Sequence, residues 1–511
     1  MAEDKTKESV MVEALERFEE SAEATDFNRN NAEADIRFSR LGEQWPEEIR
    51  KQREEEGRPC LTINKMNPLI RQVVNDARQN KPSIQVHPVD NDADVATSEV
   101  INGLIRSIER GSPADVAYDT AIDHAVSGGF GFFRIGIDYA HDETFDLEAR
   151  IHRVPNPLMV HWDPNSTRYD AEDWDYAFVS DFLTEAQFKS RYPKCEPISF
   201  EGDNRDSMNN WLDDDKIRVA EYWLRKEKKR DIVMLSDGSI MREDQMPARA
   251  KAILEAGGMS ATGGTDDEIV QAVMAATGIT ETRRRSVSYY EVMRRIINGA
   301  EVLEEDSWPG STIPICPVWG DEVIVDGRRH FRSMTRDARD PQMMMNFWRS
   351  QTTELVALAP RAPWIGPVGF IPKGQEDKWA NANTRSFAFL EYDPSSGGAP
   401  QRNAFAGVPA GALQEAMNAA DDIKAVTGIY DAAIGAKSNE TSGRAILARQ
   451  RESDVSNFHF IDNLSRAIQY AGKVLVEIIP AVYSPRQTIR ILGEDMTEKV
   501  VKLVGSNNGN Q

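Results

Sequence analysis

The sequence has little of the chemistry from which metal sites and disulfide frameworks are built. Only three cysteines occur in 511 residues, far apart and without a CxxC pair, which indicates a reducing compartment and argues against zinc or disulfide sites. The seven histidines form neither an HExxH motif nor an i, i+4 pair, and there is no GxSxG motif. We therefore expect no catalytic, cofactor-binding or metal-binding residues.

Basic residues and long apolar runs are also scarce. Asp and Glu number 83 against 61 Lys and Arg, a formal charge of −22, which disfavours a general nucleic-acid binder but permits a channel through which DNA passes without sticking. The first thirty residues are rich in glutamate, and the longest apolar tract near the end, residues 474–483, contains Glu477 and Pro480. Neither a leader peptide nor a transmembrane helix is expected.

One acidic cluster leaves two interpretations open. The carboxylates of this cluster fall within thirteen residues, at Asp163, Asp170, Glu172, Asp173 and Asp175. Such hard oxygen donors suit a divalent cation, which would make a metal-dependent nuclease or hydrolase the enzyme alternative. The spacing lacks the central glycine and terminal glutamate of an EF-hand, so a solvated loop is the preferred interpretation.

The acidic N-terminal segment, residues 1–57, is predicted to be helical. It holds 17 Asp and Glu against 9 Lys and Arg, and a thin apolar stripe recurs at helical spacing in Val12, Leu15, Phe18 and Ala22. We interpret it mainly as a solvated arm, with a helix for a specific partner as the alternative.

The first two-thirds of the chain is predicted to be of the mixed α+β class, because helices and strands do not alternate regularly. Helices are expected over residues 93–110 and 113–127, followed by a hairpin of residues 132–139 and 147–154. Asn298-Gly299 and Asp326-Gly327 each stand between strand-like segments and predict two more hairpins. Residues 217–224 and 231–235 are predicted to be separate strands.

The last third is predicted to be mainly helical. Asp340-Pro341 is a typical N-cap and first position of a helix, expected to run to Ala359. A proline-rich, compact segment follows, then a helix over 409–427, a polar loop over 436–443 and a very long helix over 444–479.

Several motifs in this order resemble the portal proteins of tailed bacteriophages, especially those of short-tailed phages. The resemblance covers roughly residues 30 to 500. It rests on Thr62-Ile-Asn-Lys-Met-Asn-Pro68 with Val73-Val74-Asn75, Gly128-Gly-Phe-Gly-Phe-Phe-Arg134, Trp162-Asp-Pro164 before the acidic run, Asp340-Pro-Gln342 with Ala359-Pro-Arg-Ala-Pro363, and Gly435-Ala-Lys-Ser-Asn-Glu-Thr-Ser-Gly-Arg-Ala-Ile446.

The resemblance implies a portal fold assembled as a dodecameric ring, without catalytic activity or cofactor, at one vertex of the virion capsid. On this pattern the chain divides into the acidic arm (1–57), a mixed α/β wing (58–335), stem helix 1 (336–359), a small clip (360–405), stem helix 2 (406–428), a tunnel-loop region (429–443), a long wing helix (444–480), and a wing strand with the C-terminal end (481–511). The crown of the family is expected to be minimal or absent.

The resemblance also implies partners and sites. Genomic double-stranded DNA would be packaged and ejected through the ring without sequence specificity. The ring would assemble in the host cytoplasm with the major capsid protein and scaffolding protein, and would dock the large terminase and then a tail adaptor. The candidate tunnel loop contains Tyr430, Asp431, Lys437, Ser438, Asn439 and Glu440. The candidate clip contacts to DNA are Lys373, Lys378 and Arg385. The candidate stem-packing residues are Met344, Phe347, Trp348, Leu355, Leu413, Met417 and Ile423. Another ring-forming head–tail connector is the structural alternative.

Overall fold

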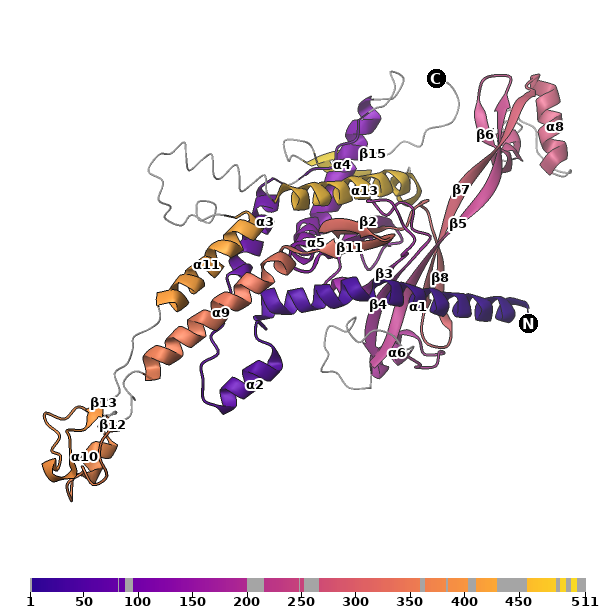
Figure 1. Cartoon of the computed structure of the whole chain (residues 1–511). Coiled ribbons are helices and arrows are strands. Elements are labelled where there is room, and N and C mark those ends of the chain that lie inside the picture. The colour runs from indigo at the N-terminus through magenta and orange to yellow at the C-terminus, as the bar shows by residue number, and fades with distance from the viewer. Residues whose placement is uncertain are drawn as a thin grey trace, which may run out of the picture.

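Two antiparallel β-sheets, covered by helices, form the body of the molecule, and two long extensions leave it (Figure 1). The computed structural model describes residues 2–80, 82–87, 95–199, 216–247, 249–251, 266–358, 364–382, 385–402, 410–429, 457–483, 488–492 and 498–502. These residues combine helix and strand throughout, so the mixed α and β class predicted from the sequence is confirmed.

The smaller sheet has the order β2-β1-β9 and lies on helix α5. Its strands are β1 (Phe130–Tyr139), β2 (Leu147–Arg153) and β9 (Ile315–Trp319), so the first predicted hairpin is confirmed. Gly131 permits the close approach of β1 to α5 (Ala114–Gly128), because a Cβ at this position would lie 2.0 Å from the carbonyl oxygen of Ala121. Phe130, Phe132 and Phe133 are all fully buried, which places this glycine-rich strand at the centre of the core.

The larger sheet has the order β3-β4-β5-β7-β8, with β6 paired to the far end of β5. Its strands are β3 (Val160–Trp162), β4 (Tyr176–Thr184), β5 (Lys216–Leu235), β6 (Ile240–Arg242), β7 (Glu281–Ile297) and β8 (Val302–Trp308). The Asn298-Gly299 hairpin is confirmed between β7 and β8. The prediction of two strands within residues 217–235 is wrong: β5 is one strand of 20 residues, because β7 pairs with it along almost its whole length.

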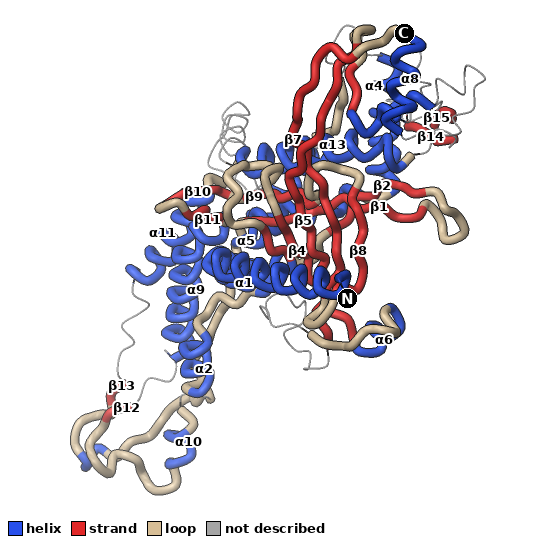
Figure 2. The backbone as a smooth tube through the Cα atoms, turned by 90° about the vertical axis from the view of Figure 1, so that its right-hand side faces the viewer, coloured by secondary structure: helices blue, strands red, loops and turns tan. Residues whose placement is uncertain are grey.

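Beyond the body, β5 and β7 continue as a two-stranded ribbon that carries β6 and α8 (Asp266–Thr277) at its end (Figures 1 and 2). On the body, β10 (Asp321–Val325) and β11 (Arg328–Arg332) form the predicted second hairpin. Its turn residues Asp326 and Gly327 have φ values of 51° and 75°, which is the left-handed conformation that a two-residue turn of this kind requires.

Helix α1 (Ala2–Ile36) crosses the larger sheet and is part of the body. Met11, Ala14 and Phe18 are buried there, and the Phe18 ring meets Phe178 edge to face at 5.3 Å. Arg29 is fully buried and donates hydrogen bonds to the carbonyl oxygens of Leu158 and Val160. The interpretation of this segment as a solvated arm is therefore wrong, because Leu15 and Phe18 of the predicted stripe pack on the larger sheet, although Val12 is half exposed.

The remaining helices are the π-helical η1 (Arg37–Leu41), α2 (Glu47–Glu55), α3 (Met66–Gln79), α4 (Val95–Gly111), η2 (Pro157–Met159), α6 (Glu185–Arg191), η4 (Glu243–Gln245) and α13 (Phe458–Val482). Of these, η1, α3, α4, η2 and α13 contribute buried residues to the main core, α6 packs in a smaller cluster through Phe188, and η4 follows β6 on the ribbon. The predicted helices over 93–110 and 113–127 are confirmed as α4 and α5. Of the long helix predicted over 444–479, the described part is α13, and residues 444–456 lie outside the described residues. Strands β14 (Thr488–Leu492) and β15 (Glu498–Lys502) form a separate hairpin.

The second extension is a pair of antiparallel helices with a small unit at its end (Figure 1). The helices are α9 (Met334–Leu358) and α11 (Ala410–Thr427), and the small unit holds β12 (Trp364–Ile365), α10 (Glu376–Ala380), η6 (Pro394–Ser396) and β13 (Gln401–Arg402). The prediction that α9 begins at Asp340-Pro341 is wrong. Ser333 caps the helix instead, because its Oγ accepts a hydrogen bond from the backbone N–H of Arg336 at 3.0 Å, and Pro341 lies inside the helix.

Candidate functional site

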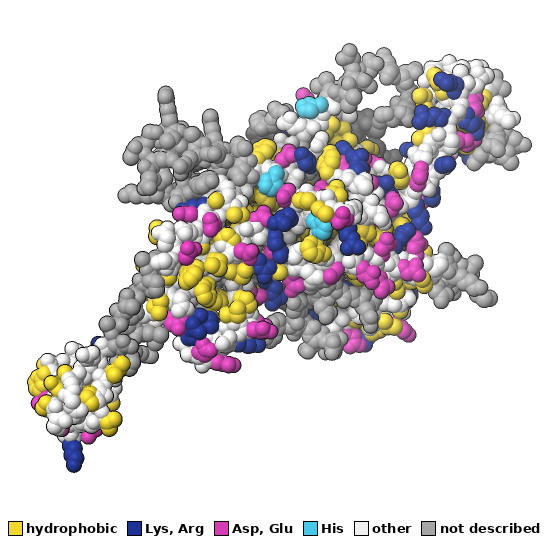
Figure 3. Space-filling view, viewed as in Figure 1, with side chains coloured by type: hydrophobic (Ala, Val, Ile, Leu, Met, Phe, Trp, Pro, Cys, Tyr) yellow, Lys and Arg dark blue, Asp and Glu magenta, His cyan; other side chains and the backbone are white. Residues whose placement is uncertain are grey.

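The helix pair α9–α11 has an apolar face that nothing in the described part of the chain covers. Met344 and Phe347 on α9 are 47% and 40% exposed, and Leu413 and Met417 on α11 are 45% and 63% exposed. In Figure 3 apolar side chains gather on this rod. Large apolar side chains left open on neighbouring helices are typical of a surface that another protein covers.

The other candidate stem-packing residues lie deeper. Ile423 is 1% exposed and packs in the main core, whereas Trp348 and Leu355 are half-buried. The structure thus divides the predicted set into one buried residue, two half-buried residues and four that are exposed on the subunit. The sequence pattern predicted that these positions are apolar, but it could not show which of them would be exposed.

A different face of α9 is polar and buried, and it holds the rod to the body. Gln342, Asn346 and Ser350, spaced four residues apart, accept hydrogen bonds from the backbone N–H groups of Lys65, Ile63 and Leu61 at 3.1, 2.9 and 2.9 Å. We name these three side chains the α9 polar ladder. It joins two of the motifs that carried the resemblance, the segment before α3 and the start of the predicted stem helix. The sequence analysis did not predict the ladder. The pattern that could have indicated it is the spacing of four residues between three side chains that can each donate and accept hydrogen bonds.

The small unit at the end of the rod is held by aromatic residues. Trp379 meets Trp364 at 5.3 Å and Phe370 at 5.1 Å, edge to face in both cases, and its indole N–H donates to the carbonyl oxygen of Glu391. Val368 and Phe389 are largely exposed, so this unit also presents apolar surface.

The candidate DNA contacts of the clip are spread over this small unit. Lys373 and Arg385 are exposed, and the Lys378 ammonium lies 5.8 Å from the centre of the Phe389 ring. Among the described residues none of the three forms an ion pair with a carboxylate. The six tunnel-loop candidates, Tyr430, Asp431, Lys437, Ser438, Asn439 and Glu440, lie outside the described residues.

The acidic cluster is a folded loop whose carboxylates bind the loop's own N–H groups. Asp173 accepts hydrogen bonds from the Ser166 hydroxyl and from the backbone N–H groups of Thr167 and Arg168 at 2.7 to 3.0 Å. Burial opposes ionisation of Asp173, but these hydrogen bonds outweigh it and the pKa is lowered. Asp163 accepts from the N–H groups of Asn165 and Asp175, and burial raises its pKa.

The other carboxylates of the loop pair with cations. Arg168 binds Asp170 through two nitrogens, at 2.8 and 2.7 Å, and also Glu172, while Lys473 on α13 lies 3.7 Å from Asp170. In the described portion of the chain, no group of three or more His, Cys, Asp or Glu residues is arranged to hold a metal ion. The arrangement therefore favours a structural loop over the metal-dependent nuclease alternative.

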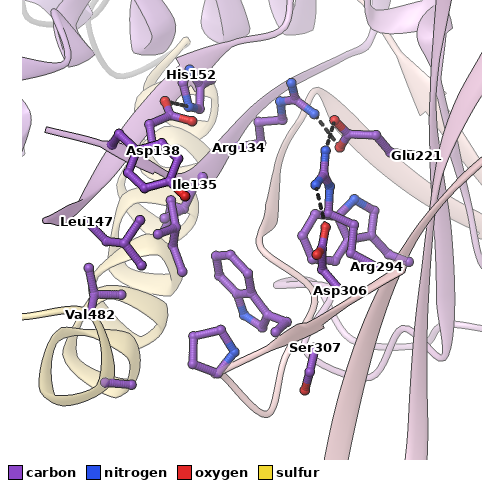
Figure 4. A pocket seen from close by; sticks show the side chains of 17 residues that line it. Arg134, Ile135, Asp138, Leu147, His152, Glu221, Arg294, Asp306, Ser307 and Val482 are labelled. Atoms are coloured by element: carbon purple, nitrogen blue, oxygen red, sulfur yellow. Dashed lines mark hydrogen bonds and ion pairs between the residues drawn. The ribbon is translucent and has the colours of Figure 1, made fainter. Parts of the chain in front are cut away.

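A cavity of about 670 Å³ lies between the two sheets and α13 (Figure 4). Glu221 lies beside it and pairs with Arg134 and Arg294 at 2.5 and 3.1 Å, and Arg294 also binds Asp306 at 3.2 Å. Burial alone would raise the pKa of Glu221, but the two guanidinium groups lower it overall. This chain of charges connects β1 of the small sheet with β5, β7 and β8 of the large sheet.

An elongated shape and an uncovered apolar rod are typical of a subunit of a larger assembly. The comparisons with known proteins agree. The model of the phage P22-like portal protein family matches residues 15–511, and the chain belongs to this family. The resemblance found from the motifs is thereby confirmed.

A portal protein of Acyrthosiphon pisum secondary endosymbiont phage 1 is 26% identical over 475 residues. The alignment covers 89% of this chain and 62% of that protein, so the chain spans less than two thirds of the length of this relative. No helix in the described ranges is long and apolar enough to cross a membrane.

Proposed function

We propose that this chain is the subunit of a phage portal ring. The ring occupies the unique vertex of the capsid, and genomic double-stranded DNA is packaged and later ejected through its centre. The ring docks the large terminase during packaging and a tail adaptor afterwards, and it assembles in the host cytoplasm with the major capsid protein and scaffolding protein. It carries out no chemical step itself. Family membership and the open face of the rod support this proposal.

In this proposal each part of the chain has a place in the ring. Helices α9 and α11 are the two stem helices, within 336–359 and 406–428, and the aromatic unit between them is the clip, 360–405. Residues 58–335, which form most of the body, are the wing, and α13 belongs to the long wing helix of 444–480. The region 429–443 is the tunnel loop, and residues 481–511 end the wing.

The observation that carries the proposal is the uncovered apolar face of the rod. A ring closes when one surface of each subunit meets a different surface of the next, and antiparallel helices standing side by side around a pore supply such contacts. Burial of a large apolar side chain contributes about 1.5–3 kcal/mol. The four residues are already about half buried in the subunit, so each can contribute only part of this amount at a contact between neighbours.

The charge of the chain is compatible with a channel for DNA. Each copy carries a formal charge of −22, and a polyanion that must slide through the ring is then repelled over most of the surface. Isolated cations such as Lys373, Lys378 and Arg385 are suited to brief phosphate contacts rather than to tight binding.

The test is assembly with the other components of the cognate phage. We expect procapsids formed with its capsid and scaffolding proteins to contain one ring of this chain at a single vertex in cryo-electron micrographs reconstructed without imposed symmetry. Particles from which the chain is absent, or in which it decorates all vertices equally, would contradict the proposal.

A further inference from the structure

The ribbon of β5 and β7 has two faces of different character. Residues directly opposite one another in an antiparallel pair lie on the same face, and the register pairs Lys226 with Glu291, Lys228 with Tyr289, Arg230 with Val287, Ile232 with Arg285 and Met234 with Arg283. We name these ten residues the basic face. It has five cations and one carboxylate, in a protein whose net charge is −22.

The opposite face of the ribbon is electrically mixed, and it is covered towards the end of the ribbon. Val233 and Leu235 are buried there with Met246, and α8 contributes Val270 and Met274 to the same cluster. Arg284 on this face is neutralised by Asp231, Glu243 and Glu281. Nearer the body, Glu227, Lys229 and Tyr290 on the opposite face are exposed, so the two faces differ mainly in their balance of charge.

The basic face is open, and most of its cations lack a counter-charge. Lys226, Lys228, Arg283 and Arg285 are exposed. Lys228 pairs with Glu291, but in the described part of the chain Lys226, Arg283 and Arg285 have no carboxylate partner. Basic side chains also gather on this ribbon in the space-filling view (Figure 3).

An aromatic ring lies among these cations. The Arg230 guanidinium is 4.5 Å from the centre of the Tyr289 ring, which fixes its position on the face. The row from Lys226 to the position of Arg283, opposite Met234, spans eight residue steps, or about 27 Å at 3.4 Å a step. This length corresponds to about eight base-pair steps of duplex DNA, which is less than one turn of about 34 Å.

We propose that the basic face of the ribbon binds the phosphate backbone of double-stranded DNA on the outside of the ring, away from the central channel. The inference rests on the proposed function in taking DNA as the polyanion. The basic face presents a row of cations and no cluster of amide side chains that could read bases. Its contacts with DNA should therefore be independent of the base sequence and sensitive to salt. The rest of the acidic surface would confine the duplex to this face.

The test uses the assembled full-length chain and a covalently closed circular duplex, which cannot thread a closed channel. Binding is measured by mobility shift over a series of salt concentrations. The variant Lys226→Gln/Lys228→Gln/Arg283→Gln/Arg285→Gln removes four cations of the basic face. A control, Arg50→Gln/Lys51→Gln/Lys189→Gln/Lys194→Gln, removes the same charge from other exposed positions.

We expect the first variant to bind the circle at least tenfold more weakly. The slope of log binding constant against log salt concentration should also become less steep by about three to four, because each lost phosphate contact removes ~0.9 from it. The control variant should leave both the affinity for the circle and the slope of its salt dependence nearly unchanged. Equal loss in both variants, or no binding of the circle by the unmodified ring, would overturn the inference. A basic-face variant that binds the circle normally but no longer assembles would also overturn it, and would assign the face to an acidic surface of another subunit.

Failure here is distinguishable from failure of the proposed function. Placement of the ring at one capsid vertex does not depend on the basic face, so a correctly placed ring that ignores circular DNA contradicts only this inference.

Discussion

The side-chain oxygen of Asn346 accepts a hydrogen bond from the backbone N–H of Ile63 at 2.9 Å, across 283 positions of sequence. Asn346 is fully buried, and its amide nitrogen donates to Gln44 at 2.6 Å. The proposed stem is therefore attached to the wing by a polar ladder rather than by apolar contacts alone. Because the partners are backbone groups, the ladder fixes the position of α9 along its axis.

The ladder leads to a stability prediction. Asn346→Ala leaves the N–H of Ile63 buried without its acceptor, and each such group costs about 1–3 kcal/mol. We expect a free energy of unfolding lower by that amount in chemical denaturation of the subunit. Gln52→Ala, which removes only an exposed bond within α2, should change the free energy by less than about 0.5 kcal/mol. Equal effects of the two variants would contradict the role given to the ladder.

The charge chain beside the cavity makes a second prediction. Glu221→Gln leaves Arg134 and Arg294 close together without their shared carboxylate, and we expect a loss of about 2–4 kcal/mol, because the two arginines remain partly exposed. Asp306→Asn removes an exposed partner of Arg294 and should cost less than about 1 kcal/mol. Paired denaturation curves measure both. If the Glu221→Gln variant were as stable as the Asp306→Asn variant, the ion pairs of Glu221 with the two arginines would contribute little to stability.

His124 on α5 gives a prediction for acid conditions. Burial first, and then Arg153 and Arg40, lower its pKa to about 4 from the ordinary 6.5. Since the unfolded chain takes up the proton at higher pH than the folded chain, the free energy of unfolding should fall as the pH drops from about 6.5 to 4, by roughly 2–3 kcal/mol from this group. We expect His124→Gln to reduce this dependence on pH, whereas His87→Gln, at an exposed position, should leave it unchanged. An unaltered pH profile in His124→Gln would contradict the assignment.

The open face of the rod predicts an assembly defect. Replacing Phe347 and Met417 together by glutamine removes two large apolar side chains that are exposed in the single subunit, so the fold should keep its stability while rings become fewer. Sedimentation velocity measures the ring fraction, and circular dichroism measures the fold. Ile240→Gln, at the far end of the ribbon, changes an equally exposed apolar residue and should not reduce ring formation. Undiminished rings in the double variant would mean that another surface joins the subunits.

Local signals predicted the hairpins and several helices correctly. Asp326-Gly327 specifies its turn through its own backbone preferences, and Gly129, at φ 100°, ends α5 in the same way. The turn at Asn298-Gly299 is shaped by a side chain, because the Asn298 side-chain oxygen accepts hydrogen bonds from the N–H groups of Ala300 and Glu301. Such features depend on a few adjacent residues, and the sequence contains them entirely.

The errors fall where distant residues decide the structure. The charged run 226–231 resembles a loop, but pairing with β7 keeps it extended. The start of α9 moves to Ser333 because the Ser333 hydroxyl also binds buried Asp35 of α1 at 2.7 Å, a contact that only the folded chain brings together. On α1 the packing of Phe18 against Phe178 and Tyr222 also lies outside what the sequence shows, and it turns Val12 of the predicted stripe to the surface. The basic face emerges only from the register of two strands about sixty residues apart.

We expect the chain to form a closed ring around an open channel. Mass photometry of the purified protein, with class averages of the same sample, tests it most directly. We predict a ring of twelve copies of 57.4 kDa, about 0.69 MDa, with a central hole. A stable monomer or a twofold dimer that does not form rings when the cognate capsid and scaffolding proteins are added would contradict this expectation.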